Sequence, residues 1–353
     1  MKDINSRNIK RLEEIISEAE KPVIVTHMKP DGDAMGSSLA LYHLIVSMGK
    51  KAKIVLNDNW PSYLGFLIEK AAQEDICIYQ NDAASATAAI SGSDLIFCLD
   101  FNAFHRTDNL EAPLAASTAA KVLIDHHLNP DRNCFDLSFS ETEISSASEL
   151  LYQIMMALPA ISSSASALPY AAAEALMTGM TTDTNNFANS VYPSTLRMAS
   201  ALLEAGVDRD GILMNLYNRH SENRLRLMGL MMKDLLKITD DGVAYIVLDR
   251  KTQEAYEVAE GDTEGFVNMP LSIGKVRMSL LLKDDGDRAR VSIRSKRGTS
   301  ANMCAKLYFN GGGHENAAGG RLRIPTDIAG IEEAAAYIER YTHIYLNENE
   351  DNN

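Results

Sequence analysis

The apolar residues in the first half of the chain fall into short β-branched runs, separated by stretches with helical periodicity. The runs KPVIVTH, KAKIVLND, SDLIFCLD and AAKVLIDHH each predict a strand that ends on acidic or imidazole residues. An apolar-periodic helix, LALYHLIVSMG, follows the first run. Alternating strands and helices are typical of an α/β fold with a mostly parallel, helix-covered sheet. Ligands bind to such sheets beyond the carboxyl ends of the strands, where the strand order reverses.

The middle of the chain is predominantly helical. Residues 145–178 are rich in Ala, Ser and Leu and predict helices, interrupted by a turn near 162–169. The segment TGMTTDTNNFANS breaks the helical period and predicts a loop. From Ser194 to about Lys237 the sequence predicts two helices joined near residues 206–210, the later part serving as a connector.

The pattern changes again in the last third of the chain. VAYIVLD, GKVRMSLLLKD and RARVSIRSK each predict a strand. FNGGGHENAAGG predicts a glycine-rich loop before a last helix, IEEAAAYIERYTHIYL. These elements predict a second, smaller α/β domain.

A chain of 353 residues is too long for one compact core of ordinary size, so we expect two domains. The last residues, NENEDNN, are acidic and lack apolar side chains, which indicates disorder. The predicted parts are an N-terminal domain, a helical connector, a C-terminal domain and a disordered tail, over residues 1–192, 193–238, 239–345 and 346–353.

Composition predicts a soluble protein, since 46% of the residues are hydrophobic, 23% are charged and no apolar run is long enough to cross a bilayer. The first twenty residues indicate an amphipathic helix without the apolar core of a secretory signal, so we expect a cytoplasmic protein. The cysteines are far apart and form no CxxC pair, which favours free, mostly buried thiols: Cys77, Cys98, Cys134 and Cys304.

The net charge of −14 argues against sequence-independent binding of long nucleic acid, because phosphates would be repelled. Small phosphorylated substrates stay compatible with it. One basic segment has five cations within ten residues: Arg288, Arg290, Arg294, Lys296 and Arg297. A solvated strand edge is the alternative interpretation of that segment.

The loop after the first predicted strand contains His27, Asp31 and Asp33 within seven residues. Two carboxylates separated by one residue can point toward two different ions, and Gly32 permits a tight loop. The alternative is an ordinary turn in which an aspartate caps the next helix.

Further candidate ligands follow other predicted strands. Asp100 ends an apolar strand, where a buried carboxylate has to be paired, hydrogen-bonded or metal-bound. Asp125, His126 and His127 end another strand, and adjacent histidines point in different directions. Asp183 lies in the predicted TGMTTDTNNFANS loop. Helix capping and an Asx turn are the structural alternatives for Asp100 and Asp183.

Together these segments supply four aspartates and two histidines: Asp31, Asp33, Asp100, Asp183, His27 and His126. This set suits a pair of divalent cations such as Mn²⁺ better than zinc or calcium, because imidazole is present and cysteine is absent. Two such ions can share a bridging hydroxide and stabilise both the attacking and the leaving oxygen at phosphorus. We therefore expect hydrolysis of a phosphoester.

Five motifs in the same order resemble those of the DHH phosphoesterase superfamily with a C-terminal DHHA1 domain: HMKPDGDAMGS, CLDFNAFHR, LIDHH, TGMTTDTNNF and FNGGGHENAAGG. The resemblance covers nearly the whole chain. It implies a DHH domain, then the helical connector, then a smaller DHHA1 domain. Within the superfamily the chain is most similar to the bacterial NrnA-type enzymes, which degrade short oligoribonucleotides and dephosphorylate 3′-phosphoadenosine 5′-phosphate.

The resemblance also implies a role for each motif residue. His27 and Asp31 would hold a first metal, and Asp33, His126 and Asp183 a second, with Asp100 bridging the two. Asp125 would orient a histidine, and His127 would face the phosphate or the leaving group. His105 and Arg106 would lie near the scissile phosphate, although a surface position is the alternative for Arg106.

In the second domain the resemblance implies a substrate-binding set: Arg294, Ser295, Gly312, Gly313 and His314. Glycines let backbone N–H groups approach phosphate oxygens, although a flexible turn is the alternative. Asn310 stands where the family usually has a further glycine, and asparagine tolerates the left-handed conformation.

The function implied is that of a Mn²⁺-dependent phosphodiesterase that hydrolyses short oligoribonucleotides to 5′-mononucleotides, and 3′-phosphoadenosine 5′-phosphate to AMP. One alternative is hydrolysis of cyclic di-AMP or of the linear dinucleotides pApA and pGpG. Another, from a different class, is a non-catalytic nucleotide-binding regulator. The expected partners are short single-stranded RNA and small phosphorylated nucleotides, not long duplexes or membranes. Homodimer formation is left open.

Overall fold

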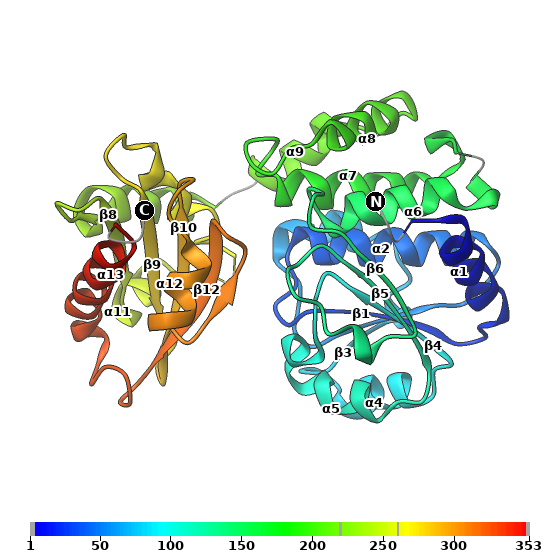
Figure 1. Ribbon diagram of the computed structural model, residues 1–353, viewed down its shortest axis with the longest axis horizontal. Coiled ribbons are helices and arrows are strands. Elements are labelled where there is room, and N and C mark those ends of the chain that lie inside the picture. Colours follow the sequence, from blue (N-terminus) through cyan, green and yellow to red (C-terminus); the bar gives the residue numbers. More distant parts are fainter. Residues whose placement is uncertain (1–3, 162, 219–220, 260, 351–353) are drawn as a thin grey trace. The chain divides into compact units, whose positions relative to one another are not determined.

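The computed structural model describes residues 4–161, 163–218, 221–259 and 261–350. The chain divides into two compact units, residues 1–219 and 220–353 (Figure 1). We call them unit 1 and unit 2. The division falls within the segment 193–238 that the sequence predicts to be a connector.

Unit 1 contains a six-stranded sheet in the order β3-β2-β1-β4-β5-β6, and every neighbouring pair is parallel. The strands are β1 (Pro22–Thr26), β2 (Lys53–Leu56), β3 (Ile76–Ile78), β4 (Leu95–Leu99), β5 (Ala120–Asp125) and β6 (Leu137–Ser140). The strand order reverses between β1 and β4, which are adjacent. The parallel sheet predicted from the sequence is confirmed, although the short edge strands β3 and β6 were not predicted.

Helices cover both faces of this sheet (Figure 1). Those of unit 1 are α1 (Ser6–Glu18), α2 (Gly32–Ser47), α3 (Gly65–Ile68), α4 (Ala83–Ser91), α5 (Glu111–Ala116), α6 (Ala147–Ala157), α7 (Tyr170–Asp183), α8 (Pro193–Glu204) and α9 (Arg209–Tyr217). Ile24 and Ile124 point to the face packed against α1, α2, α6 and α7. Val25 and Leu123 point to the opposite face, which α4 and α5 cover. Burial on both faces explains the continuous apolar runs of these strands.

The first part of one predicted loop, residues 178–183, is helical instead, whereas residues 184–190 form turns and bends as predicted. Helix α7 continues to Asp183, so the Thr182-Asp183-Thr184 triplet lies at the helix end, not in a loop. Most of α7 is buried on all sides and therefore has no polar stripe to reveal its period. The threonines also fit a helix, since Thr178 Oγ1 donates to Glu174 O at 2.8 Å. The predicted turn after α6 holds short 3-10 segments, and Ser162 lies outside the described residues.

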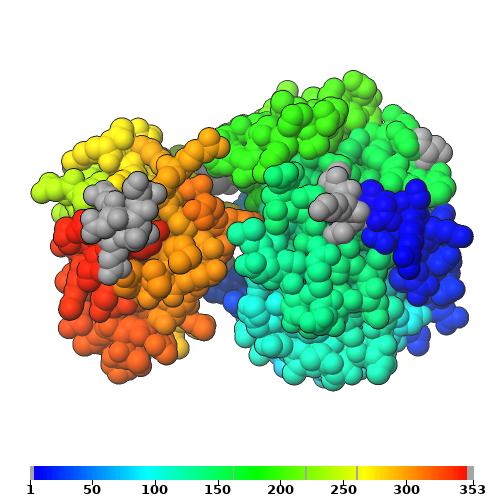
Figure 2. Space-filling model, in the orientation of Figure 1, coloured from blue at the N-terminus to red at the C-terminus, as the bar shows by residue number. Residues whose placement is uncertain are grey.

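Among the described residues of the segment 194–237, the structure has three α-helices where the sequence predicts two. Helix α10 (Glu222–Leu230) follows α8 and α9 and belongs to unit 2, where it continues into a short π-helical segment, Met231–Leu235. Its residues Leu227 and Met231 pack against strands of that unit. Figure 2 shows α1, α8 and α9 at the surface of unit 1.

Unit 2 has a mixed six-stranded sheet in the order β11-β12-β10-β9-β8-β7, in which only β8 and β9 are parallel. The strands are β7 (Lys237–Ile238), β8 (Val243–Leu248), β9 (Met278–Asp284), β10 (Arg288–Ser295), β11 (Gly312–Gly313) and β12 (Ala317–Arg323). The remaining helices are α11 (Arg250–Ala255), α12 (Ala301–Tyr308) and α13 (Ala334–Glu350). Helices α12 and α13 pack on one face of this sheet through Cys304 and Ile338.

Two predictions for the end of the chain need correction. The glycine-rich segment is not only a loop, because it forms β11 and the beginning of β12, which pair with each other. Helix α13 continues to Glu350, so residues 346–350 of the predicted disordered tail are helical, and 351–353 lie outside the described residues.

The cysteine prediction is confirmed, since all four are free and only Cys134 is not buried. No helix among the described residues is long and apolar enough to cross a membrane.

Candidate metal centre

The first motif begins where β1 ends. His27 follows Thr26, whose hydroxyl donates to Leu99 O at 2.9 Å and so ties the ends of β1 and β4 together. Asp31 caps α2, because its Oδ1 accepts from Asp33 N at 3.0 Å and from Ala34 N at 3.1 Å. The capping interpretation of Asp31 is therefore correct. The same oxygen lies 3.9 Å from His27 Nε2, and half of the Asp31 side chain is exposed.

Asp33 lies in the first turn of α2, but its side chain reaches another helix. Its Oδ2 accepts from Ala147 N at 2.6 Å and its Oδ1 from Ser148 N at 2.9 Å, both in the first turn of α6. The positive end of the α6 dipole therefore faces this buried carboxylate. These two bonds fix the orientation of Asp33.

Asp100 lies at the centre of the site. It directly follows β4 with a positive φ of 61° and is 2% exposed. Three imidazole nitrogens surround its carboxylate: His126 Nε2 at 3.3 Å, His27 Nε2 at 3.5 Å and His127 Nδ1 at 3.6 Å. Even so, its Oδ1 has no hydrogen bond of acceptable geometry within the described part of the chain. A buried carboxylate oxygen in that state fits the role of a cation ligand.

The strand β5 brings the second histidine pair to Asp100. His126 Nε2 lies 3.6 Å from Asp183 Oδ2 and 3.9 Å from Asp33 Oδ2. His127 Nδ1 lies 2.7 Å from Asp125 Oδ1, a distance at which the ring donates to the carboxylate. Asp125 is fully buried and therefore fixes the orientation of the His127 ring.

The pKa values of this cluster reflect its charges. Burial by itself lowers the pKa of His27 and His126, but the neighbouring Asp100 outweighs it and raises them to about 9 and about 10. Burial would raise the pKa of Asp100, yet the histidines hold it well below its usual value. Burial, together with the charges of Asp100 and Asp183, raises the pKa of Asp33.

Two groups of donor atoms overlap at Asp100. His27, Asp31 and Asp100 offer atoms within 4.8 Å of one another, and so do Asp33, Asp100 and His126. Asp183 adjoins the second group through His126. Imidazole nitrogen and carboxylate oxygen in two sets that share one carboxylate fit a pair of divalent cations.

Glycines allow α2 and α7 to approach closely enough for this arrangement. A Cβ atom on Gly36 would lie 2.6 Å from Ala175 O and 2.8 Å from Gly179 Cα. A Cβ atom on Gly179 would lie 2.0 Å from Ser148 Oγ and 2.9 Å from Asp33 Oδ1. Both side chains have to be absent for α2 and α7 to bring Asp33 and Asp183 within 4 Å of His126 Nε2.

Asp58 was not singled out from the sequence. It follows β2, and its Oδ2 accepts from Lys29 N at 2.6 Å, in the loop between His27 and Asp31. Gln80 Nε2 donates to its other oxygen at 2.7 Å. Asp58 thus fixes the ligand loop. The sequence did contain a signal for Asp58, because an acidic residue at the end of a predicted strand is the pattern that also marked Asp100.

Arg106 and His105 lie in the 3-10 segment Phe104–Leu110, beside the site. Arg106 O accepts from Met28 N at 2.8 Å, and the Arg106 charge acts against the raised pKa of His27. His105 is exposed, and its side chain makes no hydrogen bond or ion pair within the described residues. The structure therefore places Arg106 near the cluster, whereas no contact of His105 with the cluster is seen among the described residues.

The predicted substrate residues lie in unit 2. Arg294 Nη1 donates to Ile293 O at 2.9 Å at the end of β10. Ser295 is buried, and its hydroxyl donates to Thr299 O at 2.6 Å, so it holds the following turn. Gly313 has φ 152° and its N–H donates to Asn302 Oδ1 at 3.1 Å, while Gly312 pairs with Gly319.

His314 follows β11 and is partly exposed, and its N–H donates to Ala317 O at 2.8 Å. Asn310 has φ 46°, which confirms that asparagine adopts the left-handed conformation here.

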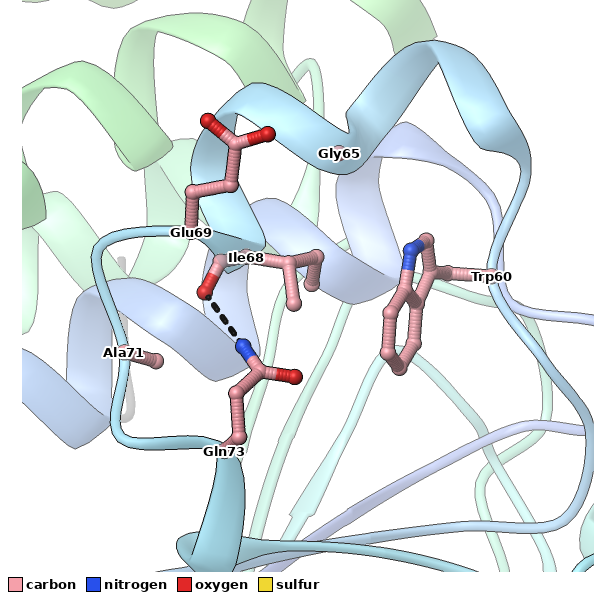
Figure 3. A pocket seen from close by; sticks show the side chains of 6 residues that line it. All are labelled: Trp60, Gly65, Ile68, Glu69, Ala71 and Gln73. Carbon is pink, nitrogen blue, oxygen red and sulfur yellow. Dashed lines mark hydrogen bonds between the residues drawn. The ribbon is translucent and has the colours of Figure 1, made fainter.

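A pocket of about 420 Å³ opens elsewhere in unit 1, near α3 (Figure 3). Trp60 and Ile68 line it, and Gln73 Nε2 donates to Ile68 O at 3.2 Å. None of its lining residues belongs to the motifs, so we do not assign the substrate to this pocket.

Comparison with known proteins identifies the family of the chain. The DHH family, N-terminal domain, matches residues 21–180, and the DHHA1 domain matches residues 232–342. A solved structure of an exopolyphosphatase-related protein from Bacteroides fragilis is 36% identical, has a TM-score of 0.90 and covers 99% of both chains. This chain belongs to the DHH family.

Two further relatives of this DHH-family protein carry more specific names. The bifunctional oligoribonuclease and PAP phosphatase NrnA of Thermus thermophilus is 28% identical over 88% of this chain and 87% of its own length. The cyclic-di-AMP phosphodiesterase GdpP of Geobacillus thermodenitrificans is 25% identical over 95% of this chain, but over only 49% of its own length. The chain is accordingly an enzyme, a hydrolase that acts on phosphoester bonds.

Proposed function

We propose that this DHH-family hydrolase cleaves short oligoribonucleotides to 5′-mononucleotides and converts 3′-phosphoadenosine 5′-phosphate to AMP. The reaction would use two divalent cations, and Mn²⁺ is the expected metal. The observation that carries the proposal is the double donor set around Asp100. The match to an NrnA-named relative over 88% of the chain supports the choice of substrate.

One set of ligands in the proposed centre would be His27 and Asp31, the other Asp33, His126 and Asp183, with Asp100 in both. Such ions, when bound, supply Lewis acidity and a nucleophile of lowered pKa for attack at phosphorus. The chain's own part is to orient the ligands: α6 holds Asp33 and the β4 end holds Asp100.

The protein groups beside the centre have separate proposed roles. Asp125 keeps the proton on His127 Nδ1 and stabilises the ring when it is charged, so His127 can carry a proton for the leaving oxygen. Arg106 would offset negative charge that develops on the phosphoryl oxygens. His105 would assist Arg106 from an exposed position, where its side chain makes no hydrogen bond or ion pair within the described residues.

The direct test is release of AMP from the dinucleotide pApA by the purified full-length chain with Mn²⁺. Asp100→Ala should reduce the rate to that of the metal-free protein and lower the bound manganese. Asp82→Ser is a matched control, because Asp82 only caps α4 and serine keeps that cap. Normal turnover by Asp100→Ala would refute the shared-carboxylate site.

Hydrolysis of cyclic di-AMP is a second candidate, because the GdpP relative matches 95% of this chain. An assay of di- to pentanucleotides, 3′-phosphoadenosine 5′-phosphate and cyclic di-AMP side by side would separate the two. A preference for the cyclic substrate would favour the second candidate. Failure on all of them by manganese-loaded protein would refute both candidate substrate classes.

A further inference from the structure

A buried carboxylate that the proposed reaction does not use lies in α6. Glu149 is fully buried, and no cation pairs with it within the described part of the chain. Its Oε2 accepts from the N–H and the hydroxyl of Ser145 and, at 2.7 Å, from Thr195 Oγ1. Its Oε1 accepts from Gln153 Nε2 at 3.2 Å. A carboxylate is too costly to bury without such donors, so these hydrogen bonds determine where Glu149 lies.

Helix capping accounts for only part of this arrangement. Ser146 caps α6 by accepting from Glu149 N at 3.0 Å, and the Glu149 side chain reaches back to the residue before that cap, much as in a capping box. A capping box needs no partner from another helix. Thr195, however, belongs to α8 and is itself fully buried. Its bond to Glu149 therefore joins the beginning of α8 to the beginning of α6.

The beginning of α6 is the part of that helix that holds Asp33. Ala147 N and Ser148 N, the two amides directly before Glu149, donate to the two carboxylate oxygens of Asp33. These amides keep their direction only while the first turn of α6 stays formed, and the bonds between Ser146 and Glu149 help to form it. A change at Glu149 should therefore affect Asp33 without direct contact.

The beginning of α8 fixes the far end of the segment that follows Asp183. Residues 184–192 connect the end of α7 to the beginning of α8. Thr195 Oγ1 accepts from Tyr192 N at 3.0 Å while it donates to Glu149. The segment is therefore held at one end by α7 and at the other by the bond between Thr195 and Glu149.

The segment 184–192 requires such anchors because part of its backbone is unfavourable. Four of its residues have a φ between 47° and 66°: Asn185, Asn186, Phe187 and Ser190. Asparagine tolerates the left-handed region, but a bulky residue such as phenylalanine rarely adopts it. Surrounding contacts have to hold such residues in place. Asn186 N donates to Thr181 O at 2.8 Å, which binds the segment back to the last turn of α7, where Asp183 lies.

We propose that Glu149 is a positioning residue for the ligand set of Asp33, His126 and Asp183. Through the first turn of α6 it orients Asp33, and through Thr195 it fixes the segment that adjoins Asp183. The inference rests on the two-cation centre of the proposed function. It predicts that loosening the bond between Glu149 and Thr195 weakens the binding of one cation and spares the other.

The first experiment needs no metal. Hydrogen exchange of the full-length protein in EDTA measures how often residues 184–192 and the first turn of α6 open. Thr195→Val keeps the shape of the side chain but removes the hydroxyl, so both segments should exchange about tenfold faster, the equivalent of one hydrogen bond. Thr195→Ser keeps the hydroxyl and should stay within about threefold of the unsubstituted protein. Equal exchange in the two variants would overturn the inference.

The second experiment titrates the same variants with Mn²⁺ and follows the EPR signal of the free ion. Thr195→Val should weaken the binding of one ion about tenfold, whereas Thr195→Ser should leave both within about twofold. Asp183→Asn identifies the affected ion, because it removes a carboxylate of the same ligand set. Glu149→Gln keeps the size of the side chain but turns one acceptor into a donor, so it should weaken the same ion at least as much.

Tyr42→Phe is the matched control for a loss of stability alone. The buried Tyr42 lies on α2, the helix that carries Asp33, and its hydroxyl donates to Asp75 Oδ2 at 2.7 Å. The variant should lower the melting temperature about as much as Thr195→Val and leave the affinity for both ions unchanged.

The outcomes separate this inference from the proposed function. If Thr195→Val binds both ions as the unsubstituted protein does, or weakens both equally, Glu149 supports only the stability of unit 1 and the positioning role is wrong. The two-cation centre would stand in that case. If the unsubstituted protein binds fewer than two Mn²⁺ ions, the proposed centre fails, and hydrogen exchange alone decides whether Glu149 and Thr195 hold the segment 184–192.

Discussion

Around Asp100, the protonation of the neighbouring histidines is coupled to the binding of a divalent cation. In the metal-free protein, His27 and His126 have pKa values raised to about 9 and about 10, where Asp100 outweighs the effect of burial. Their protons occupy the nitrogens that a divalent cation would use. Cation binding therefore has to release protons.

This coupling predicts how stability varies with pH. Below about pH 6.5 both histidines are protonated in the folded and unfolded states, and their stabilising effect is complete. Above about pH 6.5 the unfolded protein loses these protons while the folded protein keeps them, so the stabilisation decreases as the pH rises. It is lost once the pH passes the folded-state pKa values of about 9 and about 10, where the folded protein loses the protons too. The melting temperature in EDTA should fall from pH 6.5 to 10, and Mn²⁺ should remove most of that fall.

His126→Gln provides the control for this measurement. Without the second imidazole, the fall in melting temperature in EDTA should be smaller. The same slope in the variant and in the unsubstituted protein would show that other groups cause the pH dependence.

At the scale of elements, the pairing of α2 with α7 decides whether the ligands meet. Asp33 begins α2 and Asp183 ends α7, and the two helices touch through Gly36 and Gly179. The contact is between backbones, so it cannot adjust by a change of side-chain rotamer.

Gly36→Ala should therefore destabilise the protein by about 2 kcal/mol and weaken manganese binding, because the helices have to separate. Gly229→Ala in α10 is the matched control: its Cβ meets nothing within 4 Å, and the protein should become more stable by about 0.5–1 kcal/mol. Urea unfolding and manganese titration measure both effects. Unchanged manganese affinity in Gly36→Ala would contradict this role of the helix contact.

At the scale of the whole molecule, the chain has two units with different chemistry. Unit 1 contains the carboxylate and imidazole cluster, and unit 2 contains Arg294 and the glycine strand β11. Such a division predicts that metal binding and nucleotide binding respond to different substitutions.

Arg294→Ala should raise KM for 3′-phosphoadenosine 5′-phosphate about tenfold, the equivalent of one charge-assisted hydrogen bond, and leave manganese affinity unchanged. Arg250→Ala removes an exposed arginine of unit 2 elsewhere and should change neither quantity. A parallel loss of manganese and nucleotide binding in Arg294→Ala would contradict the division between the units.

The sequence by itself determined the parallel sheet, the two-part organisation and the residues of the cluster. Local patterns contain this information, because the apolar runs mark β1, β2, β4 and β5. A polar residue that follows such a run lies at the carboxyl end of the strand, where parallel sheets bind their ligands. The resemblance to the DHH family was readable for the same reason: each motif is a short continuous segment.

Only the tertiary structure decided the features that depend on neighbours distant in sequence. Helix α7 reaches Asp183 although burial on all sides conceals its period, and Asp58 acts on a loop about thirty residues away. The row of Lys283, Arg290 and Arg321 exists only through the register of three strands. A sequence shows which residues are charged, but pairing across the sheet decides which charges meet.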